Sequence, residues 1–271
     1  MCSAFLRAAL ILLLLPTAAQ ARELRVCADP NNLPFSNQRG EGFENRIAEI
    51  LAEELDAELR YTWWAQRRGF VRNTINAGLC DLVPGIVTGF DTLRTTRPYY
   101  RSGYVFVTRS DRDLEIASLN DPVLRTVLVG IQLVGDDNPP PAKALARRGI
   151  VDNIRGYMIY GDYAEPNPAA RIVAAVAERE VDVAIVWGPL AGYFAAHGAV
   201  PLTISPVRPE VDGPTLPMIF DISMGVRRDE IALRDEIDAA LARRRGDIDR
   251  VLAEFGVPRF DSPAVEARSA K

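Results

Sequence analysis

The chain of 271 residues has few of the residue types that build metal and catalytic centres. His197 is its single histidine, and Lys143 and Lys271 are its only lysines, so arginine supplies nearly all of the positive charge. No CxxC, HExxH or GxSxG motif occurs. Zinc sites and Ser–His or Cys–His catalytic sites need several such groups in one place. We therefore expect no metal site, no catalytic residue and no cofactor.

The chain also lacks the excess of positive charge that nucleic-acid binding requires. Its formal net charge is −4 at pH 7, whereas proteins that bind nucleic acid carry a basic patch or stripe. Trp63 and Trp64 are adjacent, and adjacent side chains on a strand point to opposite faces. The two rings therefore cannot form a base-stacking platform on one face. We expect no nucleic-acid partner.

The N-terminus carries the only long apolar run, and it is short for a membrane span. Ala8–Leu15 lies between Arg7 and Pro16, whereas a spanning helix needs about 20 apolar residues. The small-residue ending Ala19-Gln20-Ala21 completes the pattern of a signal peptide. We predict that residues 1–21 are cleaved after Ala21 and that the protein is exported, periplasmic in a Gram-negative source and not membrane-embedded. A retained N-terminal anchor is the alternative.

Cys27 and Cys80 are the two cysteines that remain after removal of the signal peptide. Two cysteines in an oxidising compartment are candidates for a disulfide. They fall in the first and third predicted strands, which are neighbours in a doubly wound sheet of order 2-1-3. Such neighbours lie about 4.8 Å apart, near bridging distance. We predict a Cys27–Cys80 disulfide, and two separate buried thiols are the alternative.

Short apolar runs alternate with helical periodicity along the whole chain. The expected strands are Leu24–Ala28, Glu58–Trp64, Cys80–Val87, Thr126–Gln132, Gly156–Gly161, Asp182–Trp187 and Met218–Val226. The expected helices are Gly42–Leu55, Arg68–Gly78, Pro139–Arg148, Asn167–Val181 and two more from Asp229 and Asp247. Successive β-α-β units predict parallel sheets with right-handed crossovers. Two α/β lobes fit this pattern better than one continuous sheet.

Two segments have local features that bear on a site. In Gly42–Leu55, Phe43, Ile47 and Leu51 share an apolar face, and the acids are expected on the opposite face. Arg68 and Arg72 are four residues apart and would share a face of the following helix. Positive charge at a helix start is unfavourable, which marks Arg68 as a candidate for a cleft or an interface.

Six segments in order resemble the periplasmic solute-binding proteins of polar amino-acid transporters. They are LRVCADPNNLPFS, GEGFENRIAEILAEEL, INAGLCDLVPG, RPYYRSGYVFV, VDVAIVWGPLA and DISMGVRRDE. The resemblance implies a type II periplasmic-binding-protein-like clamshell of two α/β lobes, each with a mostly parallel sheet flanked by helices. It places two chain crossings near Arg101–Tyr104 and Ile219–Ser223. Lobe 1 would comprise residues 22–103 and 222–271, and lobe 2 residues 104–221.

Three segments narrow the resemblance to one branch of that fold. TWWAQRRGFVRNTINAGLCD, RTTRPYYRSGYVFV and IVWGPLAGYF are similar to the quinoprotein-dehydrogenase-associated proteins, the J proteins of methanol-oxidation operons. Membership would imply an accessory role beside a methanol or alcohol dehydrogenase that depends on pyrroloquinoline quinone (PQQ), together with its cytochrome c. It would imply no catalytic residues.

The positions that bind ligand in the amino-acid receptors are altered here. Asn32 and Arg68 stand where those receptors place aromatic rings, and Trp187 stands where they place an acid. Their carboxylate-binding arginine is absent from VTGFDT, and QLVGDDNPPP replaces their Gly-Thr anion site. Without these charge-assisted bonds an α-amino-acid ligand is not expected. The candidates for a cleft that binds a ligand or a partner are Asn32, Phe35, Arg68, Tyr104 and Trp187.

Two alternatives and one segment stay open from the sequence. The chain would otherwise be a transport receptor for a small organic solute, or an enzyme such as a dehydratase, for which His197 has no evident partner. The run Pro139–Pro141 either projects as a rigid extended segment or is a plain loop before a helix.

Overall fold

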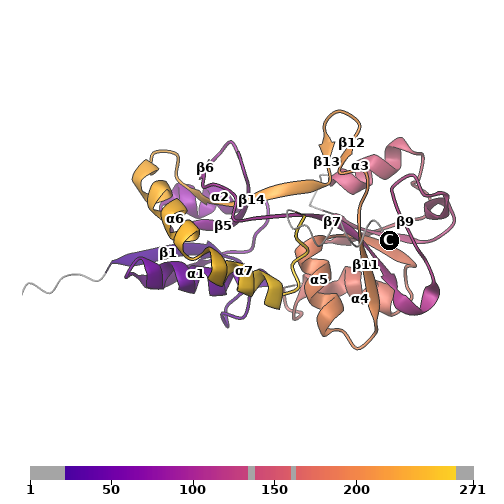
Figure 1. The fold of residues 1–271 in the computed structure, drawn as a ribbon, viewed down its shortest axis with the longest axis horizontal. Helices are drawn as coiled ribbons and strands as arrows, with labels where there is room; N and C mark the ends of the chain where they lie inside the picture. The colour runs from indigo at the N-terminus through magenta and orange to yellow at the C-terminus, as the bar shows by residue number, and fades with distance from the viewer. Residues whose placement is uncertain (1–21, 134–137, 160–162, 261–271) are drawn as a thin grey trace, which may run out of the picture.

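Two lobes lie side by side and are joined by two long strands (Figure 1). The computed structural model describes residues 22–133, 138–159 and 163–260. The predicted signal peptide, residues 1–21, lies outside the described residues. No helix in the described part is long and apolar enough to cross a bilayer.

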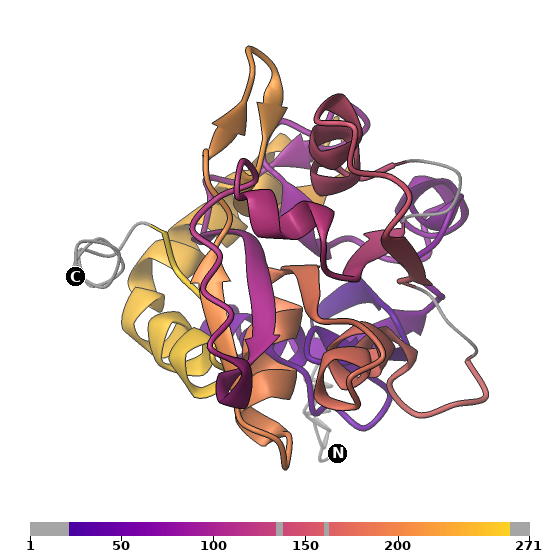
Figure 2. The same cartoon turned by 90° about the vertical axis from the view of Figure 1, so that its right-hand side faces the viewer.

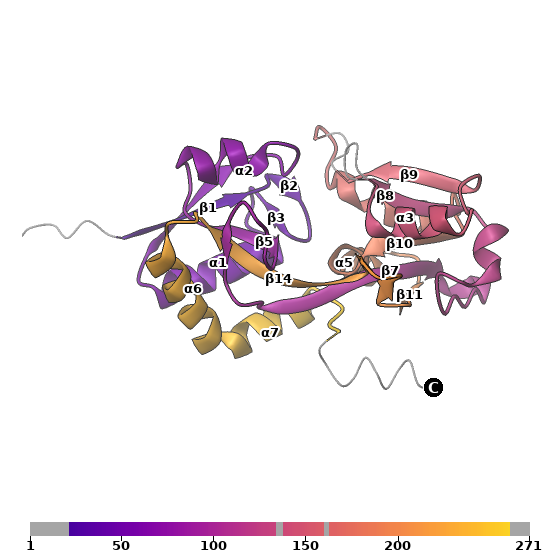
Figure 3. The same ribbon diagram turned by 90° about the horizontal axis from the view of Figure 1, so that it is seen from above.

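The joining strands are β7 (Tyr100–Arg109) and β14 (Ile219–Val226), which run antiparallel between the lobes (Figure 3). Ile219 pairs with Gly103 and Ile222 pairs with Tyr100, so the two predicted crossings are confirmed. Because the crossings lie side by side, their backbone groups pair, and this ladder joins strands of both lobes in one eight-stranded sheet. The sheet has the strand order β5-β14-β7-β10-β8-β9 and therefore runs through both lobes, whereas the sequence pattern favoured two lobes over one continuous sheet.

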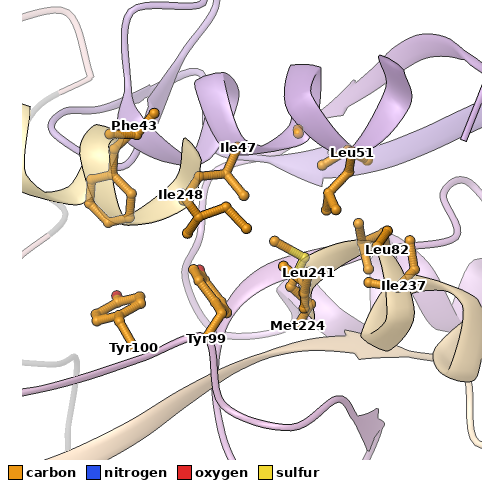
Figure 4. Close-up of a cluster of buried hydrophobic side chains, with 14 of the residues drawn as sticks. Phe43, Ile47, Leu51, Leu82, Tyr99, Tyr100, Met224, Ile237, Leu241 and Ile248 are labelled. Carbon is orange, nitrogen blue, oxygen red and sulfur yellow. The ribbon is translucent and has the colours of Figure 1, made fainter. Parts of the chain in front are cut away.

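Lobe 1 is built on a parallel pair, β1 (Glu23–Ala28) and β4 (Glu58–Trp63). Its helices α1 (Phe43–Glu54), α6 (Ile231–Arg243) and α7 (Arg245–Glu254) pack their apolar faces together (Figure 4). Smaller elements complete it: β2 (Asn31–Asn32), β3 (Ser36–Asn37), α2 (Phe70–Asn73), η1 (Ile75–Ala77), β5 (Val83–Val87) and β6 (Arg94–Thr95). The C-terminal helices thus close the core that the N-terminal strands begin.

A disulfide joins Cys27 to Cys80 across lobe 1, with the two Cα atoms 5.6 Å apart. Next to it, Val26 forms a parallel bridge with Leu82. The segment that enters β5 therefore lies beside β1, on the edge of β1 that does not pair with β4. The predicted disulfide and the 2-1-3 neighbour relation are confirmed. Phe70 and Ile75 cover the buried sulfur atoms.

The predicted helix Arg68–Gly78 is wrong at its start, and it is divided at Thr74 into α2 and η1. Gly69 has a left-handed φ of +89°, and α2 begins only at Phe70, so Arg68 lies in the preceding turn and shares no helix face with Arg72. The Thr74 hydroxyl donates to the Phe70 carbonyl at 2.7 Å, and such a bond competes with helix continuation. Gly78, with a φ of +74°, ends the segment as predicted.

Lobe 2 centres on the parallel strands β8 (Val129–Leu133), β9 (Ile154–Met158) and β10 (Val183–Trp187). Strand β7 pairs antiparallel with β10, and β11 (Leu202–Pro206) pairs antiparallel with β7. Figure 2 views this lobe end-on, with the hairpin of β12 (Val211–Asp212) and β13 (Leu216–Pro217) projecting at the top. Its helices are α3 (Pro140–Arg147), α4 (Arg171–Ala177) and α5 (Gly188–His197), with short helices η2 (Ser110–Arg112), η3 (Pro122–Arg125) and η4 (Pro168–Ala170).

The proline run opens a helix rather than projecting as an extended arm. Pro140 and Pro141 occupy the first positions of α3, where a missing N–H is tolerated and the fixed φ suits the helix. The acids Asp136 and Asp137 lie outside the described residues.

Each lobe has its own apolar core. One cluster surrounds α1 and includes Tyr99, Met224 and Leu252. Two other clusters cover the two faces of the lobe-2 sheet, one around Phe106 and one around Val186. We therefore propose the division of residues 22–103 plus 222–271 from residues 104–221, with the hinge between these cores.

Candidate ligand cavity between the lobes

A cavity of about 340 Å³ lies between the lobes above the hinge strands. Lobe 1, the hinge and lobe 2 all contribute to its walls. Its lining residues are Asn32, Phe35, Glu44, Gln66, Gly85, Val87, Tyr100, Tyr104, Gln132, Ile159, Ala169, Trp187, Leu190, Phe220 and Ile222. A concave, largely apolar space with a few polar groups is the usual form of a small-molecule site.

Three aromatic rings form the hinge side of the cavity. The Tyr104 and Trp187 ring centroids are 5.6 Å apart, and Phe220 lies 6.0 Å from Trp187 and 6.5 Å from Tyr104. All three pairs meet edge to face, the favourable geometry for ring quadrupoles. Burial raises the pKa of the Tyr104 hydroxyl to about 12, so this group stays neutral.

Amide groups supply most of the polar lining. The Asn32 side chain donates to Gln66 Oε1 at 3.3 Å within lobe 1. In lobe 2, Gln132 Oε1 accepts the Trp187 backbone N–H at 2.7 Å, which fixes the amide at the start of α5. Neutral amides bind by hydrogen bonds without imposing a charge preference.

Four of the five candidate residues predicted from the sequence line this cavity: Asn32, Phe35, Tyr104 and Trp187. Arg68 is exposed in the turn before α2 and is not among the lining residues. Of the residues that the structure describes, no arginine or lysine lines the cavity. The site therefore offers no charged partner to a ligand carboxylate.

Among the described residues, Glu44 is the one ionisable carboxyl in the lining, and the sequence interpretation misplaced it. It lies in the first turn of α1 and is only 6% exposed. The expectation that the acids of this helix face solvent is wrong for Glu44, which lies three and seven residues before Ile47 and Leu51 and so shares their face. That spacing is the signal that would have identified it.

The Glu44 carboxyl lies against Gly85 of β5. A Cβ atom at Gly85 would stand 2.3 Å from Glu44 Oε1, so glycine makes room for the carboxyl. Burial, with a smaller contribution from the charge of Asp29, raises the pKa of Glu44 to about 8. At neutral pH without a ligand the group is mostly protonated.

A second set of contacts connects the lobes beside the cavity. The Tyr163 hydroxyl of lobe 2 donates a hydrogen bond to Asp29 Oδ2 at 2.5 Å. The Arg67 Cζ atom lies over the Tyr163 ring, 4.9 Å from its centroid. Asn31 donates to the Glu165 carbonyl at 2.8 Å and accepts the Asn167 N–H at 3.1 Å. We call these contacts the Tyr163 bridge.

The fold and cavity can now be set beside known proteins. No protein-family model matches the chain. The protein MoxJ of Methylorubrum extorquens is 36% identical over 250 residues, which cover 88% of this chain and 82% of MoxJ. The chain belongs to the MoxJ family. The predicted resemblance is confirmed at this level.

Solved structures agree with the MoxJ assignment. The periplasmic binding protein XoxJ of Methylobacterium extorquens AM1 is 38% identical with a TM-score of 0.72, covering 88% of this chain and all of XoxJ. MxaJ of Methlophaga aminisulfidivorans is 27% identical with the same TM-score and coverage. An ancestral cationic amino acid solute binding protein, at 20% identity and a TM-score of 0.65, shows the fold alone. The predicted type II clamshell is confirmed.

Proposed function

We propose that this protein is a periplasmic accessory protein that binds a PQQ-dependent methanol or alcohol dehydrogenase and helps it to mature. Membership of the MoxJ family is the observation that carries the proposal, because the J proteins resembled by the sequence accompany such dehydrogenases. The family relation also supports a binding role rather than catalysis. The cytochrome c of the same system is a second partner in this proposal.

The composition of the cavity supports an accessory role over amino-acid capture. A zwitterion needs a cation for its carboxylate, and no arginine or lysine among the described residues lines the cavity. The candidates for contacting the partner are Asn32, Phe35, Arg68, Tyr104 and Trp187. Four of them face the cavity, and Arg68 stands exposed on the same lobe as Asn32.

Deletion of the gene, followed by complementation, tests the proposal. We expect the deletion strain to accumulate inactive dehydrogenase, and the tagged wild-type protein to co-purify with the enzyme and restore its activity. Trp187→Ala should weaken both effects, because an interface residue of this size dominates its contacts. Trp64→Ala, which alters an exposed tryptophan outside the cavity lining, is the matched control. Normal dehydrogenase maturation in the deletion strain would refute the proposal.

We also propose export with cleavage after Ala21, which leaves Arg22 as the first residue. Arg22 pairs with Glu236 of α6 at 2.5 Å, so this residue already belongs to lobe 1. The intact mass of the protein from a periplasmic extract tests this. A mass that retains residues 1–21 would contradict it.

A transport receptor for a small organic solute is the second candidate, because residues of both lobes line the cavity. A bound ligand stabilises the folded state by mass action. Thermal-shift screening with organic acids, quinone-like compounds and alcohols tests this candidate. No shift with millimolar compounds would count against it.

A further inference from the structure

The Glu44 carboxyl is buried at the cavity without a polar side-chain partner among the described residues. It is 6% exposed and lines the cavity, and within the described part of the chain no side chain donates a hydrogen bond to it or forms an ion pair with it. Asp29, also buried, accepts the Asn31 N–H, the Gln66 N–H and the Tyr163 hydroxyl. Buried carboxyls are normally satisfied as Asp29 is. An unsatisfied one that faces a cavity is available to a ligand.

The rest of the cavity fits an organic cation. Trp187, Tyr104 and Phe220 present aromatic rings, whose faces attract cations. Asn32 and Gln132 add amides of no net charge. The negative charge of ionised Glu44 is therefore not compensated by any arginine or lysine of the described lining. A bound anion would be repelled by the Glu44 carboxylate and would find no positive side chain in the described lining.

We propose that the cavity binds a small organic amine in its ammonium form, with the ammonium group on the Glu44 carboxylate and an apolar body against the aromatic rings. The volume of about 340 Å³ limits the ligand to the lower end of the range for small-molecule sites. The amine site shares Asn32, Tyr104 and Trp187 with the partner contacts proposed above, but the argument for it rests on Glu44 and the cavity and not on a protein partner.

The groups around Glu44 make the binding depend on pH. Among the described residues, Asp29, Tyr61, Tyr99 and Tyr100 are the ionisable groups that interact with it from neighbouring elements. Burial raises the pKa of Tyr61 to about 12 and also raises the pKa of Tyr99 and of Tyr100 well above the usual tyrosine value. These hydroxyls stay neutral between pH 6 and 9, whereas Glu44, with a pKa of about 8, ionises in that interval.

The test is calorimetric titration with three probes of similar shape: 2-phenylethylammonium, neutral 2-phenylethanol and anionic 3-phenylpropionate. At pH 9 we expect the ammonium to bind most tightly and the carboxylate not to bind. Glu44→Gln should weaken the ammonium by about 10- to 100-fold, the equivalent of a hydrogen bond to a charged group. Glu49→Gln, on the exposed face of the same helix, is the matched control and should leave binding unchanged.

The pH profile separates a charge contact from a packing effect. Each unit of pH below the Glu44 pKa of about 8 should lower the affinity for the ammonium probe up to about tenfold. Glu44→Gln should remove this dependence. Absence of ammonium binding at 10 mM, on the order of the weakest specific affinities, would overturn the proposal. So would equal ammonium affinity in Glu44→Gln, or tighter binding of the alcohol than of the ammonium at pH 9. Circular dichroism of each variant verifies that it is folded.

Discussion

Glu44 in the cavity wall and Asp212 in the β12–β13 hairpin are equally buried carboxyls, each 6% exposed, with opposite surroundings. Asp212 receives Arg148 Nη2 at 2.6 Å and has Arg147 Nη1 at 3.6 Å. The Arg148 hydrogen bond, with the charges of both arginines, lowers the pKa of Asp212, whereas burial without a partner raises that of Glu44. A paired buried acid is part of the structure, and an unpaired one beside a cavity marks a site.

The disulfide stabilises lobe 1, the lobe that contains the unpaired Glu44. Of the changes considered, removing the disulfide should lower the free energy of unfolding the most. In the double variant Cys27→Ser/Cys80→Ser, the unfolded chain is no longer cross-linked into a loop between two cysteines that are 53 residues apart. The chain-entropy model gives a loss of about 4 kcal/mol in the free energy of unfolding. Urea unfolding of the variant and of reduced wild-type protein measures it. A loss below about 1 kcal/mol would show that the frame is stable without its cross-link.

Breaking the paired acid should cost less, about 2 to 3 kcal/mol. Asp212→Asn leaves the Arg148 guanidinium, whose side chain is 17% exposed, without its anion. Because the pKa of Asp212 is lowered on folding, its contribution is present above the unfolded value and is lost as pH falls through the folded value. The free energies of unfolding of wild type and Asp212→Asn, measured with urea, should therefore approach each other as pH falls below about 4. An equal difference at pH 3 and pH 7 would contradict the charge pair.

Glu44→Gln should have the opposite sign and stabilise the ligand-free protein. A carboxyl whose pKa is raised to about 8 binds more protons folded than unfolded, so stability falls as pH rises from about 4.5 to 8. The amide removes that cost, and we expect a gain of about 2 kcal/mol at pH 9, after allowance for water entering the cavity. No gain should appear at pH 4.5. Urea unfolding at both pH values measures this, and destabilisation at pH 9 would show that Glu44 holds the fold.

The order of elements and the disulfide were predictable because they follow from local periodicity and from strand order. Glu44 was missed because an acid on an amphipathic helix was expected to face solvent, whereas Gly85, 41 positions along the chain, makes room for its carboxyl inside. Arg68 was placed on a helix that Gly69 prevents from starting there. These features depend on tertiary contacts or on a single backbone conformation, which periodicity does not report.

The Tyr163 bridge had no sequence signal either, since it joins residues 134 positions apart. Tyr163→Phe removes the hydroxyl that reaches Asp29 but keeps the ring below Arg67. We expect the smallest effect of the series, about 1 kcal/mol, and a larger radius of gyration in small-angle scattering, because the lobes lose a contact beside the Glu44 cavity. Tyr157→Phe is the control, since the buried Tyr157 hydroxyl has no hydrogen-bond partner among the described residues. The same radius in both variants would mean that the hinge strands alone set the separation of the lobes.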